Sequence, residues 1–125
     1  MQPYLLYVSA GITVFIAITH SYLGEKKLLP HLISGVVSHF RGDTKRTGAI
    51  VRWAWHLTSL AWVALALLLI VFARMPADVR VLPVAIIAGC LALSGVVCFV
   101  TTRGKHVAWP FFLAASTTAA IGSLG

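Results

Sequence analysis

The sequence predicts an all-α membrane protein: a bundle of four transmembrane helices with a short amphipathic interfacial helix in its first cytoplasmic loop. Of its 125 residues, 59% are apolar and only 10% are charged, and the mean hydropathy is +0.92. Soluble domains carry about 25% charged residues. Apolar runs close to the ~20 residues that cross a bilayer recur four times, and they cover nearly all of the chain outside residues 24–50. We therefore expect residues 1–125 to form a single integral membrane domain.

The positions of the basic residues predict the orientation of these helices. The net charge of +7 would suggest a nucleic-acid partner in a soluble protein. Here, however, the basic residues gather in or beside the first loop (Lys26, Lys27, Arg41, Lys45, Arg46 and Arg52) and the third (Arg103 and Lys105). Only Arg74 and Arg80 border the second loop. Because basic loops stay in the cytoplasm, we expect a bacterial inner-membrane protein with both termini outside, in the periplasm, and no nucleic-acid partner.

The first span is predicted at about residues 4–23. Ser9, Thr13, Ala17 and His20 recur every three or four residues along it. This spacing places them on one helical face. Small and hydroxyl side chains let membrane helices approach closely and form hydrogen bonds. We therefore expect this face to point into the bundle and the helix to end near Gly24.

The first loop is predicted to contain an interfacial helix at residues 28–40. Its apolar residues fall on one helical stripe (Leu28, Leu29, Leu32, Ile33, Val36, Val37 and Phe40). About 13 residues are too few to span a bilayer, so the helix should lie on the cytoplasmic leaflet. The basic and histidine side chains of the loop should contact anionic lipid headgroups (Lys26, Lys27, His31, His39, Arg41, Lys45 and Arg46).

The remaining spans are predicted at about residues 50–73, 81–101 and 106–124. The last two are rich in Gly, Ala, Ser and Thr, which indicates close contact with neighbouring helices. Cys90 and Cys98 are eight residues apart in the third span, about 12 Å along a helix. That separation is too long for a disulfide, so we interpret both as packing residues.

Histidines supply the candidate site. His20 and His56 should each lie about one turn inside the cytoplasmic boundary, and His106 opens the fourth span at a similar depth. Antiparallel packing could gather these three imidazoles with Arg52, with Glu25 next to them. Arg52, His56 and Ser59 share one face of the second span. Ionisable residues within a membrane are candidate functional groups.

Four hypotheses fit this polar cluster. In the first, its side chains satisfy one another and nearby carbonyls, and they fix the register of the helices. In the second, His20 and His56 hold a b-type haem. In the third, His20, His56 and His106, with Glu25, bind a transition metal. In the fourth, the cluster transfers protons or anions.

The leading functional prediction is a non-enzymatic one. The sequence contains no phosphate-binding glycine loop, no G-x-S-x-G and no C-x-x-C. It does contain extensive small-residue faces and a basic loop. We therefore expect an accessory or interaction subunit of a membrane assembly, working as a homo-oligomer or within a larger complex. A haem or metal redox module and a small proton-coupled or anion transporter are the alternatives.

Overall fold

A computed structural model describes residues 3–35 and 44–124. Helix accounts for 92% of the structure, and this part of the chain contains no strand. The elements follow one another as α1 (Tyr4–Leu23), the π-helical turn η1 (Gly24–Leu28), α2 (Leu29–Gly35), α3 (Thr44–Ala73), α4 (Ala77–Thr102) and α5 (Ala108–Leu124). The predicted all-α class is confirmed.

Three helical stretches are long and apolar enough to cross a membrane. They are Tyr4–Ser34, Lys45–Ala73 and Ala77–Thr102 in the described part of the chain. The first of them runs through α1, η1 and most of α2, and its apolar part ends at Leu23 because Glu25, Lys26 and Lys27 follow. With 17 residues, α5 is a shorter apolar helix. The prediction of an integral membrane protein therefore agrees with the structure.

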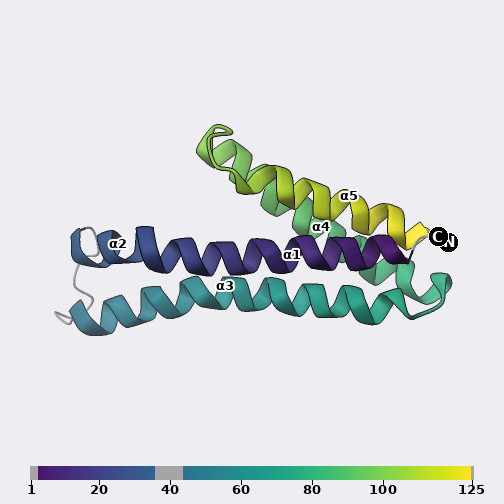
Figure 1. Cartoon of the computed structure of the whole chain (residues 1–125), viewed down its shortest axis with the longest axis horizontal. Helices are drawn as coiled ribbons and strands as arrows, with labels where there is room; N and C mark the ends of the chain where they lie inside the picture. The colour runs from purple at the N-terminus through teal and green to yellow at the C-terminus, as the bar shows by residue number, and fades with distance from the viewer. Residues whose placement is uncertain (1–2, 36–43, 125) are drawn as a thin grey trace.

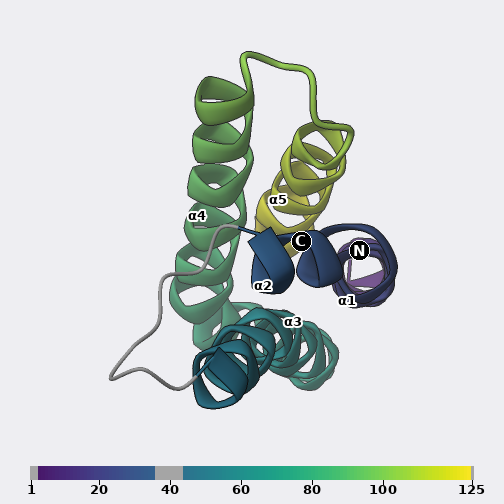
Figure 2. The same cartoon turned by 90° about the vertical axis from the view of Figure 1, so that its left-hand side faces the viewer.

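The long helices form two pairs. In Figure 1, α1 lies beside α3, and α5 lies beside α4 and also contacts α1 near the two termini. The α4–α5 pair diverges from α1 toward the end that carries η1 and α2. Figure 2 looks along the molecule from that end and shows α4 and α5 set apart from α3 and α1. Both termini and the α3–α4 turn share the opposite end.

The core lies where the two pairs converge. Leu6, Leu69, Leu91 and Ala115 are fully buried there. Ser9 is also buried, and its hydroxyl donates a 2.7 Å hydrogen bond to the carbonyl of Ala115, which joins α1 to α5. The Ser116 hydroxyl donates a 2.8 Å hydrogen bond to the carbonyl of Ala88, which joins α5 to α4.

The small-residue face of α1 is buried against neighbouring helices, as the spacing predicts. Thr13 and Ala17 are buried along with Ser9. The small side chains leave room for α5 to pack closely against α1. This face is thus used inside the protomer.

Helix boundaries differ from the predicted ones. The predicted second span starts at residue 50, but α3 begins at Thr44 and has 30 residues, about 45 Å of helix. Its first turns therefore extend beyond a ~30 Å hydrocarbon core. α4 begins at Ala77 because Pro76, which has an extended ψ of 153°, precedes it. α5 begins at Ala108 rather than at His106.

The region predicted as an interfacial helix continues α1 instead of turning onto a membrane surface. The α-helix α1 ends at Leu23, beside Gly24 as predicted, but the φ and ψ of Gly24, −58° and −52°, are helical, so the chain does not turn away there. The chain widens into the π turn η1 just before Pro30, and α2 follows in line with α1 (Figure 1). Leu29 is fully buried. Ile33 contacts Gly48 of α3, whereas Leu28 is exposed, so only part of the apolar stripe packs inside the molecule. The remaining predicted residues, 36–40, lie outside the described part of the chain.

Candidate functional site

Three of the five predicted cluster residues meet at the charged end of α1 and α3. Glu25 lies in η1, and Arg52 and His56 lie one turn apart on the facing side of α3. The Arg52 Nε is 3.1 Å from both carboxylate oxygens of Glu25. The His56 Nε2 is 3.2 Å from Oε2 of the same carboxylate. One carboxylate therefore binds a guanidinium and an imidazole from the neighbouring helix.

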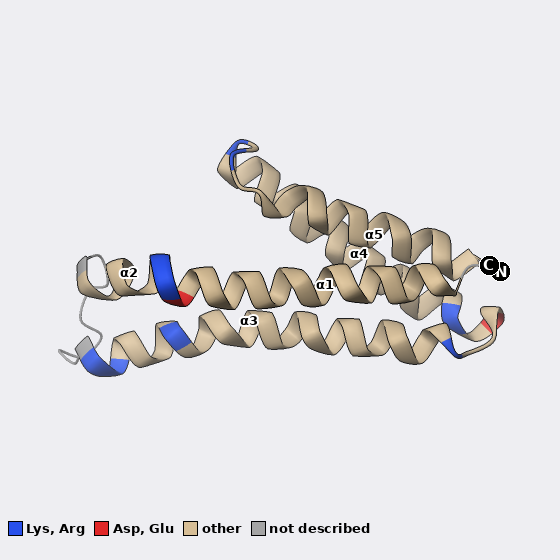
Figure 3. Cartoon of the chain, in the orientation of Figure 1, with Lys and Arg blue, Asp and Glu red and all other residues tan. Residues whose placement is uncertain are grey.

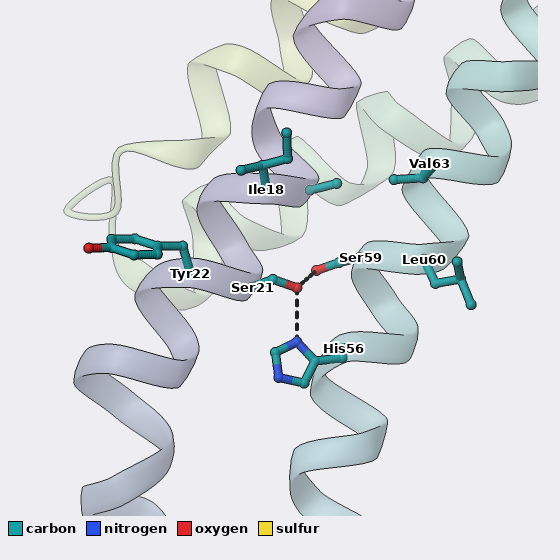
Figure 4. Close-up of a pocket in the computed structure, with 8 residues that line it drawn as sticks. Ile18, Ser21, Tyr22, His56, Ser59, Leu60 and Val63 are labelled. Carbon is teal, nitrogen blue, oxygen red and sulfur yellow. Dashed lines mark hydrogen bonds between the residues drawn. The ribbon is translucent and has the colours of Figure 1, made fainter.

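Two serines extend this contact along the helices. The Nδ1 of His56 is 2.9 Å from the Ser21 hydroxyl, which in turn donates a 2.9 Å hydrogen bond to the Ser59 hydroxyl. Figure 4 shows Ser21, His56 and Ser59 in a row between the two helices. They line a shallow groove of about 540 Å³, which we call the α1–α3 groove, together with Ala17, Ile18, Tyr22, Leu60 and Val63.

The row of polar groups has two hydrogen-bonding arrangements, which differ by one proton on His56. If the Ser21 proton points to Ser59, then the Ser21 oxygen must accept a hydrogen bond from Nδ1–H, and His56 is an imidazolium paired with Glu25. If both hydroxyls rotate, then Ser21 donates to a neutral His56 that keeps its proton on Nε2. In both forms the Ser21 hydroxyl and the two ring nitrogens of His56 have hydrogen-bond partners, so the row can change by one proton when the hydroxyls rotate.

Glu25 is held in its charged form by this arrangement. It follows the apolar part of α1 and is 42% exposed. The hydrogen bond from His56 has the largest effect and lowers the pKa of the Glu25 carboxyl, and the hydrogen bond and charge of Arg52 lower it further. Partial burial acts in the opposite direction. The carboxylate should therefore stay charged into the acidic range.

His20 faces away from this row. Its ring stacks on Trp55, with centroids 4.2 Å apart and an interplanar angle of 5°, and meets the Trp62 ring edge-on at 5.0 Å. The indole N–H of Trp55 donates a 3.1 Å hydrogen bond to the His20 carbonyl. Gly24 makes room for this indole, because a Cβ at Gly24 would collide with Trp55. The Nε2 of His20 is buried and has no hydrogen-bond partner within the described ranges.

His106 lies on the α4–α5 turn, apart from Glu25 and His56. Its Nδ1 accepts a 3.1 Å hydrogen bond from the backbone N–H of Ala108, at the start of α5. The proton of a neutral His106 must then be on Nε2. His106 and His20 both line a second cavity between α1 and the α4–α5 pair. The predicted five-residue cluster is thus divided between two sites.

This geometry gives the haem and metal hypotheses no support. Both ring nitrogens of His56 are engaged, one with Ser21 and one with Glu25. His20 stacks on Trp55 and faces the second cavity. Among the residues that the structure describes, no three His, Cys, Asp or Glu side chains are grouped so that they could hold a metal ion.

The predicted headgroup residues lie where the chain is most basic. Lys26, Lys27, Lys45 and Arg46 are exposed near the α2 end of the molecule (Figure 3). His31 is exposed too, and its Nδ1 is 3.0 Å from the Lys27 carbonyl. The other two, His39 and Arg41, lie outside the described residues.

Sequence reasoning missed Ser21 and the structural role of Trp55. Ser21 precedes Glu25 by one helical turn, so the i, i+4 spacing of a hydroxyl and a carboxylate could have placed it on the same face. No comparable signal shows that Trp55 stacks on His20, because this contact joins residues 35 positions apart.

Fold and site together define a small all-helical protein with membrane-spanning capacity and a polar row at its charged end. Comparisons of the chain with protein-family models, with curated proteins and with solved structures found no match. Its function is therefore inferred from its own geometry.

Proposed function

We propose that this protein is a non-enzymatic accessory or interaction subunit of a membrane assembly in a bacterial inner membrane. The observation that carries the proposal is the exposure of two glycines, Gly11 in α1 and Gly89 in α4. Beyond its chain neighbours and the backbone of its own helix, no described atom lies within 4 Å of where a Cβ would be at either glycine. Gly24, Gly48, Gly95 and Gly122 all have such neighbours inside the chain.

Exposed glycines support a partner helix for a physical reason. Glycine lowers helix stability by about 1 kcal/mol relative to alanine. In membrane helices it is favoured where another backbone approaches closely. Since neither Gly11 nor Gly89 is packed by the described part of this chain, a second copy or another membrane subunit would fill the space beside them.

The proposal includes a topology. All four long helices cross the membrane, with α5 as the shortest, and form one bundle. The end of the molecule that carries η1 and α2 lies in the cytoplasm, as does the α4–α5 turn, and the exposed lysines and arginines there contact anionic headgroups. Both termini and the α3–α4 turn lie outside. Figure 3 supports this arrangement, because the described basic residues concentrate at the ends of the helices away from the termini.

Substitution of the glycines tests the proposal. Gly11→Leu and Gly89→Leu should each dissociate the native assembly, seen as a smaller species in native electrophoresis after extraction in a mild detergent. Ala120→Leu is the matched control, because Ala120 is a small exposed residue of α5. A parent protein that purifies only as a monodisperse monomer without a co-purifying protein would overturn the proposal.

A small proton-coupled transporter is the second candidate. The observation that favours it is the row from Glu25 through His56 and Ser21 to Ser59, which leads from the charged end into the α1–α3 groove. The protein reconstituted in liposomes should then carry protons down an imposed gradient. His56→Gln and Ser21→Ala should abolish this flux, whereas Thr58→Ala should not, because Thr58 bonds only its own helix at Ala54 among the described residues. No flux in the parent protein would leave the row as a structural contact.

A further inference from the structure

The second cavity lies where the two helix pairs diverge. It has a volume of about 610 Å³ and is bounded by α1, η1, α3, α4 and α5. We call it the inter-pair cavity. Its volume falls within the roughly 300–1,000 Å³ of typical small-molecule sites. Most of its wall is apolar or aromatic, including Phe15, Leu23, Phe111 and Phe112. A wall of this kind is suited to a hydrocarbon chain.

Its polar lining is basic at one end. Lys27 belongs to η1 and His106 to the α4–α5 turn, and both line the cavity. Figure 3 shows the basic residues of η1 and of the α4–α5 turn on the two sides of the divergence between the helix pairs. None of the described residues that line the cavity is acidic. The charge at this end therefore complements an anion.

Hydrogen bonding favours the same kind of ligand. The Nδ1 of His106 already accepts the N–H of Ala108, so its Nε2–H remains as a donor. The ammonium of Lys27 has donors only. An oxyanion accepts hydrogen bonds from donors of both kinds.

We propose that the inter-pair cavity binds an anionic phospholipid of the bilayer. One acyl chain lies among the phenylalanine side chains. The headgroup phosphate lies between Lys27 and His106. The His20 ring contacts the rings of Trp55 and Trp62 and forms part of the cavity wall. This wall separates the acyl chain of the lipid from the Glu25–His56 row. This site is independent of the proposed partner surface at Gly11 and Gly89, which are not among the residues that line it.

An anionic phospholipid is preferred over a neutral lipid because of the Lys27 ammonium. A lysine near an anionic lipid contributes about 1 kcal/mol, which is roughly a fivefold change in affinity, and His106 adds a hydrogen bond from its Nε2–H. Phospholipids also surround the protein at high concentration whenever it is in a bilayer. A free fatty acid likewise carries an anionic group on a hydrocarbon chain, and the experiment below distinguishes the two ligands.

Cys98 supplies a reporter inside the cavity. It lines the cavity and is partly buried, whereas Cys90 is exposed on α4 and does not line it. The Cys90→Ser protein, full length in detergent micelles, would be treated with a maleimide while phosphatidylglycerol, phosphatidylcholine or oleate is added. We expect phosphatidylglycerol to slow the modification of Cys98. Modification of Cys90 in the Cys98→Ser protein should be unchanged.

A lysine pair supplies the matched variants. Lys27→Gln should weaken the protection by phosphatidylglycerol about fivefold, and adding His106→Gln should weaken it further. Lys26→Gln should leave it unchanged, because Lys26 is the exposed neighbour that does not line the cavity. Equal protection by phosphatidylcholine would overturn the charge assignment. Protection by oleate alone would replace the phospholipid by a free acid, and no protection by any lipid would overturn the site.

Discussion

Gly24 and Trp55 show how one missing side chain positions an aromatic group. The indole of Trp55 occupies the space of a Cβ at Gly24, bonds the His20 carbonyl and stacks on the His20 ring. Gly24→Ala should displace the indole and lower stability by about 1–3 kcal/mol, as overpacking does. Thermal unfolding in detergent, followed by tryptophan fluorescence, measures this change.

Gly24→Ala in a Trp55→Ala background is the control for this prediction. The side-chain atoms nearest to a Cβ at Gly24 all belong to Trp55, so without the indole the substitution should leave the midpoint unchanged or raise it slightly. Equal losses in both backgrounds would indicate a general effect on the helix instead of a collision with Trp55.

Arg80 is a buried cation with one hydrogen bond and no acidic partner among the described residues. It is 5% exposed, and its Nη1 donates a 3.1 Å hydrogen bond to the Met75 carbonyl, while its Nε and Nη2 have no partner among the described residues. Burying a charge without an opposite charge is unfavourable. Arg80→Met should therefore leave the protein as stable or more stable, by up to roughly 4 kcal/mol. Arg74→Met, at an exposed position, is the control for thermal unfolding. A clear loss of stability would mean that the bond to Met75 outweighs the burial of the charge.

At the scale of elements, Glu25 joins η1 to α3 through Arg52 and His56. Because its pKa is lowered in the folded state, the stability it contributes is present above the usual glutamate value near 4.3. It is lost as the pH falls through the lowered value. Stability should therefore be insensitive to this group from pH 7 to about 5 and fall below about 4.

Glu25→Gln should remove that acid-dependent loss, as measured by thermal unfolding at a series of pH values. Asp78→Asn is the control, since Asp78 is an exposed carboxylate at the far end of the molecule. If the pH profile of Glu25→Gln matches that of the parent, the carboxylate does not hold η1 to α3.

At the scale of the whole molecule, the proposed topology predicts which turns are accessible from which side. In a background without native cysteines, Asp78→Cys in the first turn of α4 should react with an impermeant maleimide on intact cells. Lys105→Cys, on the α4–α5 turn, should react only after permeabilisation. The reverse pattern would invert the orientation, and reaction of both from one side would exclude the four-span topology.

Much of the fold follows from composition and spacing. A 59% apolar chain can satisfy its backbone hydrogen bonds in a bilayer by forming helices. The four-residue spacing of Ser9, Thr13 and Ala17 predicted their burial, because helical periodicity is a local property. The end of α3 at Ala73 was predicted correctly, but its start at Thr44 and the straight path into α2 were not, since they depend on contacts between α2 and α3 such as Ile33 on Gly48.

The sequence by itself determined the helical class, the apolar segments and the residues available for a site. Only the tertiary structure decided which of those residues lie in the Glu25–His56 row and which line the inter-pair cavity. The antiparallel approach of α1 and α3 brings Glu25, Arg52 and His56 together, and the divergence of α4 and α5 leaves His20 and His106 on a separate cavity. The physical reason is that periodicity specifies the face of a residue on its own helix, whereas the rotation and tilt of each helix pair come from side chains that meet across helices, such as Trp55 on Gly24 and Ser9 on Ala115.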